Sequence, residues 1–506
     1  MTTIRGFKIA TQNGNMGLDR SLVRAVAWSA TAKWITQILA WLATIVIVRL
    51  LTPHDYGLVG MAGIYLTLAT TVSQVGIADA VIAKRDLQRH QIAELNTVAV
   101  LVGVALVGVS CAVAQPLARF FSAPSLLAII MVASTTYVIN GVQVVPRALL
   151  QKDMRFKLLA GIDTACALFQ MGATLALALL GFKYWSLIIG AVAGVVMAAG
   201  LTLCWRRHRF AVPHFRNLRR ELQFSANVMA SGVGWYVYSN ADFFVAGRVL
   251  GQMPLGNYTV AWTISSAPIE KIGNSITNVT PAFFSAVQHD KAELRRYLLR
   301  LTETLSYATV PASIGLALLA APLVTVLLGP KWIGVIGPLR LLGFLMAFRS
   351  LTTLPLRILT AIGETSFVMW TTIATVIVMP IAFFLGSRWG TNGIATAWIV
   401  VYPPLTIPVF YKTFQRIEMK TRDYLSGVMP ALGSSTIMAA ALLVASFVLP
   451  HEWSSLFRLL LLGSVGVFAY IGALFAFYRG RVNRIVRAIR REQAPSTPEL
   501  AIAETH

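Results

Sequence analysis

Four ionisable side chains stand inside long apolar runs of this sequence, where a charge is costly. They are Lys33, Asp242, Glu270 and Lys271. An unpaired charge deep in a bilayer costs several kcal/mol, so such residues usually face a cavity or a partner helix. We therefore expect them to line a polar cavity that binds and passes a solute rather than breaking bonds. Glu270 and Lys271 also allow a second interpretation, an internal ion pair with no role toward a substrate.

Further polar side chains recur on the same helical faces as these charges, at 100° per residue. The four predicted helices 22–48, 57–81, 223–248 and 255–281 carry, in order, Lys33, Gln37 and Thr44; Thr67, Thr70, Thr71 and Gln74; Asn227, Ser231, Tyr238 and Asp242; and Thr263, Ser266, Glu270, Asn274 and Thr277. Ser and Thr in membrane helices often bond to their own backbone or join neighbouring helices, so for them alone a structural role is favoured. Arg349 lies in the middle of another apolar run, and Arg357 lies nearer its end, where it can also snorkel to the interface.

Motifs of soluble enzymes are missing from the sequence. It contains no GxxxxGK[ST] phosphate loop, no HExxH pair and no GxSxG nucleophile elbow. The 3 cysteines lie in apolar runs, and the 7 histidines have no metal-ligand spacing. We therefore expect no enzyme, no catalytic residue, no metal and no cofactor.

The elements that must position these residues follow from composition. The chain has 506 residues, of which 56% are hydrophobic and only 12% charged, and its mean hydropathy is +0.68. A soluble domain carries about 25% charged residues, and a membrane-spanning helix needs about 20 apolar residues. The sequence therefore predicts an all-α polytopic membrane protein with about fourteen transmembrane helices. Their predicted bounds are 22–48, 57–81, 95–115, 125–147, 158–181, 184–205, 223–248, 255–281, 300–328, 334–361, 366–386, 391–411, 427–449 and 456–478.

Basic residues indicate the orientation. Most of the 43 Lys and Arg residues fall in alternate loops and in both terminal segments. The other loops hold only Arg49, Arg119, Lys183, Arg248, Lys331, Arg340, Arg388 and Arg458. Cytoplasmic loops are enriched in Lys and Arg, so we expect cytoplasmic termini, an even number of spans and the lipid bilayer, not nucleic acid, as the partner of the +23 net charge. Tryptophans at the loop–helix junctions, Trp185 and Trp332 among them, fit an interfacial belt.

An internal repeat divides the predicted helices. Arg49-Leu50-Leu51 at the end of one predicted helix corresponds to Arg248-Val249-Leu250, 199 positions later. Tyr56-Gly57 and Gly256-Asn257-Tyr258 open the next predicted helix in each repeat. Both repeats start from the cytoplasm, so they are parallel repeats of the kind that place a transported substrate between them. In chain order, the predicted parts are an N-terminal tail 1–21, an N-lobe 22–205, a basic linker 206–222, a C-lobe 223–411, two extra helices within 427–478, and a basic tail 479–506.

Several segments resemble the bacterial polysaccharide (Wzx-type) flippases, most nearly their exopolysaccharide and colanic-acid branch. The resemblance spans residues 20 to 480. It is carried by four segments, which are the loop 49–59, the segment 240–251 with its continuation 255–258, Pro281-Ala282-Phe283-Phe284-Ser285, and Gly329-Pro330-Lys331-Trp332. This family belongs to the multidrug/oligosaccharidyl-lipid/polysaccharide superfamily. The resemblance implies two six-helix lobes around a central cavity, lined by the first two helices of each lobe.

The resemblance also implies a function, the transfer of an undecaprenyl-diphosphate-linked oligosaccharide from the cytoplasmic to the periplasmic leaflet of the inner membrane by alternating access. In that role Lys33, Lys271, Arg349 and Arg357 would bind the diphosphate, while Asp242 and Glu270 would balance charge or carry a coupling proton or sodium ion. The wider candidate substrate site adds Gln37, Gln74, Asn227, Tyr238 and Asn274. A polysaccharide polymerase or export complex is a candidate partner. Two alternatives are a drug exporter of the same superfamily and, less favoured because no long periplasmic loop is predicted, a membrane-embedded polymerase or glycosyltransferase.

Overall fold

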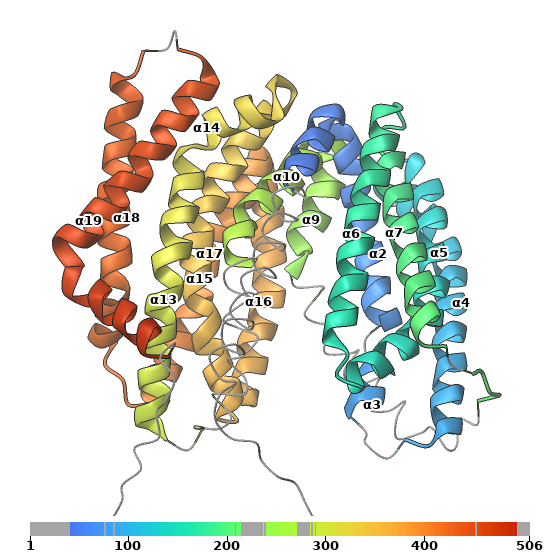
Figure 1. The fold of residues 1–506 in the computed structure, drawn as a ribbon. Coiled ribbons are helices and arrows are strands. Elements are labelled where there is room, and N and C mark those ends of the chain that lie inside the picture. The colour runs from blue at the N-terminus through green and yellow to red at the C-terminus, as the bar shows by residue number, and fades with distance from the viewer. Residues whose placement is uncertain are drawn as a thin grey trace, which may run out of the picture. The chain divides into compact units, whose positions relative to one another are not determined.

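The computed structural model describes residues 41–74, 77–83, 87–207, 209–213, 236, 239–270, 284, 287–288, 290–450 and 453–492. Within these ranges the chain is helical, with short turns and no strand (Figure 1). The predicted all-α class is therefore confirmed.

The described contacts divide the chain into two compact units, which cross the predicted lobes. The first comprises Met1–Leu51, Ile77–Ala105 and Thr135–Leu222, and the second comprises Thr52–Gly76, Leu106–Ser134 and Gln223–His506. The boundaries fall inside the long helices α4 (Arg89–Phe120) and α5 (Ser125–Lys152). The division into an N-lobe and a C-lobe, and the cavity between them, stay predictions.

The first unit also contains α3 (Ile77–Ala83), α6 (Phe156–Leu179) and α7 (Trp185–Trp205). Helices α6 and α7 run side by side (Figure 1). Small residues allow close helix approach here, since a Cβ added at Gly190 would stand 2.0 Å from the Thr174 hydroxyl oxygen. The core of this unit gathers aliphatic side chains of α3, α4 and α5, such as Val81, Leu95 and Val145.

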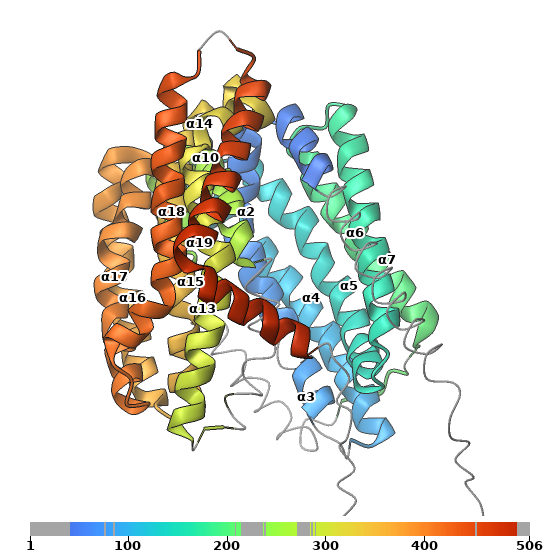
Figure 2. The ribbon, with the colours of Figure 1, turned by 60° about the vertical axis from the view of Figure 1, so that its left-hand side comes forward.

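The second unit contains the remaining helices. They are α2 (Pro53–Gln74), α9 (Ala241–Val245), η1 (Ala246–Leu250), α10 (Gln252–Pro268), α13 (Lys291–Leu318), α14 (Ala320–Leu323), η3 (Val324–Leu328), η4 (Pro330–Val335), α15 (Ile336–Ala361), α16 (Thr365–Gly386), η5 (Ser387–Trp389), α17 (Gly390–Arg416), α18 (Thr421–Val448) and α19 (Ser455–Glu492). Helices α18 and α19 form an antiparallel hairpin whose first helix packs on α13 (Figures 1 and 2). Helix α19 is broken at Tyr478, where φ is −128°.

Local sequence signals fix several helix ends. At the start of α2, the Asp55 carboxylate accepts hydrogen bonds from the Thr52 N–H and hydroxyl, and the Asp55 N–H donates to the Thr52 hydroxyl oxygen. This reciprocal pattern is a capping box, with Pro53 at the first helical position. Asp290 caps α13 by accepting from the N–H groups of Ala292 and Glu293.

Helices α2 and α10 touch through equivalent residues of the internal repeat. A Cβ added at Gly57 would lie 1.8 Å from the Gln252 carbonyl oxygen, and one added at Gly256 would lie 1.8 Å from the Pro53 carbonyl oxygen. Pro53 and Gln252 occupy the same register of the two repeats, as do the two glycines. The contact is thus reciprocal, backbone against backbone, and it gives the weak sequence repeat a structural meaning.

The described helices identify a multi-pass membrane protein. Eight of them are long and apolar enough to cross a bilayer, or up to 10 if each of two bent pairs counts as one span. One of the eight, Thr365–Arg416, joins α16, η5 and α17. The predicted total of fourteen agrees with this partial count and stays a prediction, because residues 1–40 and 271–283 among others lie outside the described ranges.

One expectation about tryptophan is wrong. Trp332 was predicted to lie in an interfacial belt, but it is completely buried, and its ring meets that of Tyr56 edge to face at 5.4 Å. A loop–helix junction places a tryptophan at the interface only if no other segment covers it, and here the start of α2 does so. Trp185 is half-buried, and its place at the interface stays a prediction.

Candidate functional site: a buried carboxylate and an arginine against two indole rings

Asp242 is fully buried at the start of α9. Its Oδ2 accepts hydrogen bonds from the Tyr258 hydroxyl at 2.7 Å and from the Trp398 indole N–H at 3.0 Å. Its Oδ1 accepts from the backbone N–H of Phe243 at 2.9 Å. Three donors from three helical segments therefore surround this carboxylate, which is how a buried charged group avoids an uncompensated desolvation cost.

The local chain is unusual around this carboxylate. Helix α9 has only five residues and continues directly into the π-helical turn η1, which ends at Gly251 with φ of +86°. Turns of this kind are rare in helices and occur often at functional sites. Here the wide turn and the left-handed glycine let α9 and α10 fold back on each other, so that Asp242 meets Tyr258 of α10.

Arg349 lies in the same cluster, in the middle of α15. Its guanidinium carbon is 5.3 Å from the ring centre of Trp262 and 5.4 Å from that of Trp398. Both distances lie within the range of cation–π attraction. Trp398 therefore contacts the cation with its face and the Asp242 carboxylate with its N–H.

Opposite charges balance each other across this cluster without a direct ion pair. Arg349 and Asp242 are both described and attract each other electrostatically, yet no salt bridge joins their side chains. Arg349 is only half-buried, whereas the carboxylate and Trp398 are fully buried. The guanidinium is thus held at the edge of the cluster, where it can still meet an anion.

Aromatic packing fixes the position of Trp398. Its ring lies 5.1 Å from Phe383 of α16, 5.5 Å from Tyr402 of α17 and 5.6 Å from Trp262 of α10. Tilted and edge-to-face pairs of this kind add to the stability that ring burial provides. Rings of α10, α16 and α17 therefore hold Trp398 in one position.

The arrangement limits the chemistry that the cluster can perform. Among the described residues, no group of three or more His, Cys, Asp or Glu side chains could hold a metal ion. The three groups that meet Asp242 are all hydrogen-bond donors in these contacts, whereas hard cations such as sodium need oxygen ligands. What the cluster offers is one buried group that can take up a proton and one cation that can bind an anion.

The structure brings together two of the predicted site residues. Asp242 and Arg349 share the cluster, but Arg357 lies about two turns further along α15 and Glu270 is exposed just beyond α10. The predicted residues Lys33, Gln37, Asn227, Tyr238, Lys271 and Asn274 lie outside the described residues, as does the side chain of Gln74. The structural interpretation of Ser and Thr fits several positions, because Thr70 and Thr263 each donate to the carbonyl four residues earlier.

Three site residues escaped the sequence analysis, namely Tyr258, Trp262 and Trp398. A tryptophan in an apolar run looks the same whether it faces lipid or a buried charge, so hydropathy gives no signal. One clue was present, since Tyr258 and Trp262 lie four residues apart and therefore on one face of a helix.

Comparison with known sequences places this chain. The family described as "Polysaccharide biosynthesis protein" matches residues 46–337, more than half of the chain. The chain belongs to this family. It is 26% identical over 344 residues to the lipopolysaccharide biosynthesis protein WzxC of Escherichia coli K12, covering 66% of this chain and 69% of that protein. It is also 23% identical over 499 residues to the succinoglycan biosynthesis transport protein ExoT of Rhizobium meliloti, covering 95% and 98%.

Solved structures show which fold this polysaccharide biosynthesis family member has. The lipid II flippase MurJ in an inward closed conformation superposes with a TM-score of 0.70 at 14% identity, covering 90% of this chain and 99% of that one. An inward-facing multidrug resistance MATE transporter superposes with a TM-score of 0.59 at 17% identity, covering 76% and 94%. The chain therefore has the transporter fold common to these two proteins.

Proposed function

We propose that this protein is a flippase that moves lipid-linked oligosaccharide repeat units across the bacterial inner membrane for surface polysaccharide synthesis. Membership of the polysaccharide biosynthesis family supports this function, and so does the similarity to ExoT, which is named a transport protein. The transporter fold agrees with it. In finer detail, the substrate is an undecaprenyl-diphosphate-linked oligosaccharide, moved from the cytoplasmic to the periplasmic leaflet by alternating access, with a polymerase downstream.

Arg349 carries this proposal. A half-buried guanidinium in an apolar bundle, held against the rings of Trp262 and Trp398, suits an anionic head group because Arg binds phosphate through several charge-assisted hydrogen bonds. Lys33, Lys271 and Arg357 are proposed to add charge along the path of the diphosphate. The polyprenyl tail stays in lipid, so only the head group needs a polar route.

Asp242 is proposed to couple substrate binding to a proton. When Asp242 takes up a proton, Arg349 loses the negative charge that balances it, so an anion binds more tightly beside it. The sign follows directly: binding of the diphosphate strengthens as the pH falls through the range in which Asp242 is protonated. A proton suits this site better than sodium because the groups around the carboxylate are donors. Glu270 remains a second proposed coupling residue.

The proposed orientation follows the distribution of basic residues, with both termini in the cytoplasm. An inside-negative membrane potential then assists export of an anion, by about 2.3 kcal/mol per charge per 100 mV. This orientation puts the start of α13 and the end of α17 on the cytoplasmic side, and the start of α15 and of α19 on the periplasmic side.

The test combines export in cells that lack the endogenous protein with binding of undecaprenyl diphosphate to the purified protein. We expect Arg349→Gln to abolish export and to weaken binding by about tenfold or more, since a hydrogen bond to a charged group contributes about 1.5–3 kcal/mol. Arg388→Gln, an exposed cation of η5, is the matched control and keeps both. Normal export by Arg349→Gln at equal membrane abundance would refute the proposed role.

A drug exporter is the second candidate, favoured by the likeness to the MATE transporter. The two functions separate in the same cells. Loss of the protein that removes surface polysaccharide and leaves drug sensitivity unchanged supports the flippase, and the reverse result supports the exporter.

A further inference from the structure

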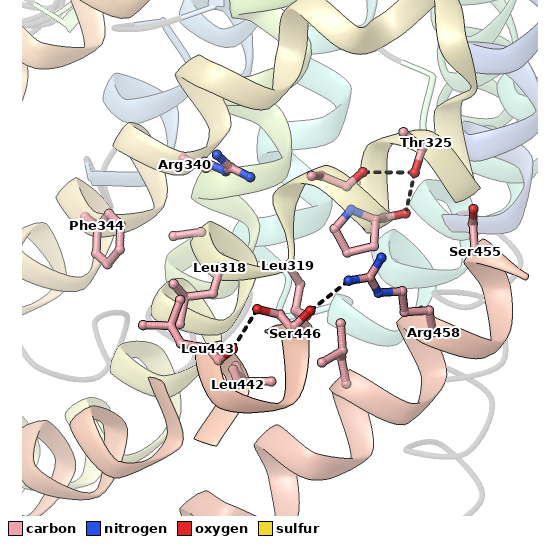
Figure 3. Close-up of a pocket in the computed structure, with 14 residues that line it drawn as sticks. Leu318, Leu319, Thr325, Arg340, Phe344, Leu442, Leu443, Ser446, Ser455 and Arg458 are labelled. Atoms are coloured by element: carbon pink, nitrogen blue, oxygen red, sulfur yellow. Dashed lines mark hydrogen bonds between the residues drawn. The ribbon is translucent and has the colours of Figure 1, made fainter. Parts of the chain in front are cut away.

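A cavity of about 530 Å³ lies in the second unit, and none of its lining residues belongs to the Asp242 cluster (Figure 3). Four segments enclose it: the end of α13 with α14 and η3, the first turns of α15, the last turns of α18, and the first turns of α19. Its size lies within the usual range of small-molecule sites, about 300–1,000 Å³. On the orientation proposed above, this cavity faces the periplasmic leaflet.

Most of its wall is hydrocarbon. Leu318 at the end of α13, the following Leu319, Leu442 and Leu443 of α18 and Phe344 of α15 line it, as Figure 3 shows. All of these side chains except Leu442 are partly or largely exposed, and Phe344 is 46% exposed. A wall of this kind, open toward the surface of a membrane protein, suits acyl chains rather than water.

Two arginines stand on this apolar wall. Arg340 projects from the first turns of α15, and Arg458 from the first turn of α19 (Figure 3). Arg458 donates to the Ser446 carbonyl oxygen at 2.9 Å, which ties the start of α19 to the end of α18. Arg340 is exposed, and within the described part of the chain it has no ion pair or hydrogen bond.

None of the residues that line this cavity is acidic, so its wall carries positive charge only. Thr325, Ser446 and Ser455 also line the cavity, but the Thr325 and Ser446 hydroxyls donate to the backbone carbonyl oxygens of Ala321 and Leu443. The groups that can bind a phosphate here are therefore the two guanidinium groups, since Arg binds phosphate through charge-assisted hydrogen bonds.

Two cations in one periplasmic cavity are unusual for a membrane protein. Periplasmic loops of membrane proteins contain few Lys and Arg residues, and the orientation proposed above leaves this chain only a handful there. Two of them, far apart in sequence, line one cavity. The general bias against outside cations gives no reason for this, whereas a bound anion does.

We propose that this cavity binds an anionic phospholipid of the outer leaflet. Its phosphate lies between Arg340 and Arg458, and its acyl chains lie along the leucine wall and Phe344. The lipid bridges the α18–α19 hairpin to α13 and α15. It therefore stabilises the attachment of α18 and α19, which lie outside the internal repeat. It is a structural lipid and not the transported substrate, whose head group is assigned to Arg349.

The test measures the unfolding temperature of the full-length protein in a neutral detergent while lipid is added. The probes are phosphatidylglycerol, phosphatidylcholine, undecaprenyl phosphate and inorganic phosphate. We expect phosphatidylglycerol to raise the midpoint more than phosphatidylcholine does. We expect Arg340→Gln to raise the half-saturating concentration of phosphatidylglycerol by about tenfold. In the Arg340→Gln, Arg458→Gln double variant, we expect phosphatidylglycerol to raise the midpoint no more than phosphatidylcholine does. The control is Arg388→Gln, because Arg388 is a cation expected on the same periplasmic side but outside the cavity. We expect this variant to keep the wild-type shift of the midpoint.

Each other outcome overturns the proposal. An equal response to both phospholipids means that no charge is recognised, and an equal shift from inorganic phosphate means that no lipid is needed. If undecaprenyl phosphate raises the unfolding midpoint more than phosphatidylglycerol does, the cavity binds the transported lipid and not a structural one. If Arg458→Gln folds poorly because the Ser446 contact is lost, Arg340→Gln alone decides, since its exposed side chain has no structural partner in the described part of the chain. None of these measurements depends on transport, so they stand apart from the test of flippase function.

Discussion

Two groups of charged side chains in the second unit differ mainly in their access to water. In the bundle, Asp242 is 0% exposed and its partners are aromatic donors. At the end of the bundle, the Glu364 carboxylate between α15 and α16 pairs with Arg416 of α17, and Glu418 accepts from Lys291 at 2.6 Å with side chains 66% and 56% exposed.

The difference shows what a charge is used for. Exposed pairs contribute little stability because water already solvates both partners. A buried carboxylate must instead be satisfied by fixed donors, and losing one hydrogen bond to such a charged group costs about 1.5–3 kcal/mol. The exposed pairs of Glu364 and Glu418 therefore tolerate substitution, whereas each residue around Asp242 is constrained by the others. That constraint is typical of a functional site rather than of a stabilising one.

The largest expected effect separates the two regions by stability. Asp242→Ala leaves the Tyr258 hydroxyl and the Trp398 N–H buried without an acceptor, so we expect a loss of about 2–4 kcal/mol. Thermal unfolding in detergent measures it, with Asp242→Asn, which keeps an acceptor oxygen, as the milder variant. An unfolding midpoint for Asp242→Ala equal to that of the wild type would mean that the carboxylate is not buried as described.

A smaller effect tests how Asp242 and Arg349 communicate. Trp398→Phe keeps an aromatic ring near Arg349 but removes the hydrogen bond to Asp242, at a cost of about 1.5–3 kcal/mol. We expect this variant to change the pH dependence of undecaprenyl diphosphate binding. Trp262→Phe, which also weakens the cation–π contact but has no described hydrogen bond to Asp242, is the matched control. Identical pH profiles for the two variants would remove Trp398 from the coupling.

The smallest effect belongs to the exposed pair. The hydrogen bond from Lys291, and its positive charge, lower the pKa of Glu418 below its usual range. A lowered folded-state pKa contributes stability above the unfolded-state pKa, and that stability is lost as the pH falls through the folded-state pKa. We expect Glu418→Gln to lower the unfolding midpoint at pH 7 by about 1 °C, and to change nothing once the pH is low enough to protonate Glu418. A large change at pH 7 would give this pair an importance that its exposure does not predict.

Hydropathy predicted the membrane-embedded parts of the fold well and the helix ends poorly. The helix predicted at 366–386 is α16 at Thr365–Gly386, but the one predicted to begin at 300 begins at Lys291. The turns from 291 to 300 are rich in charge, so they extend the helix beyond the hydrocarbon layer that hydropathy detects. Their start is set by the Asp290 cap, a signal of a different kind.

The sequence predicted only the charged residues of the site. Asp242 and Arg349 stand out because each is a costly residue in an apolar run. Their common partner Trp398 does not, since it is 156 residues away from Asp242 and fits its own helix as an ordinary apolar residue. The three residues meet because α9, α15 and α17 come together in space, which a single sequence does not reveal.

The glycine contact between α2 and α10 has a consequence for substitution. Gly57 contacts Gln252 and Gly256 contacts Pro53, so equivalent residues of the two repeats make the same contact twice, as across a two-fold axis. In a homodimer, one substitution would alter both sides of such an interface. Here both glycines belong to one chain, so a side chain added at either position alone already meets the opposite backbone and must push one helix away from the other.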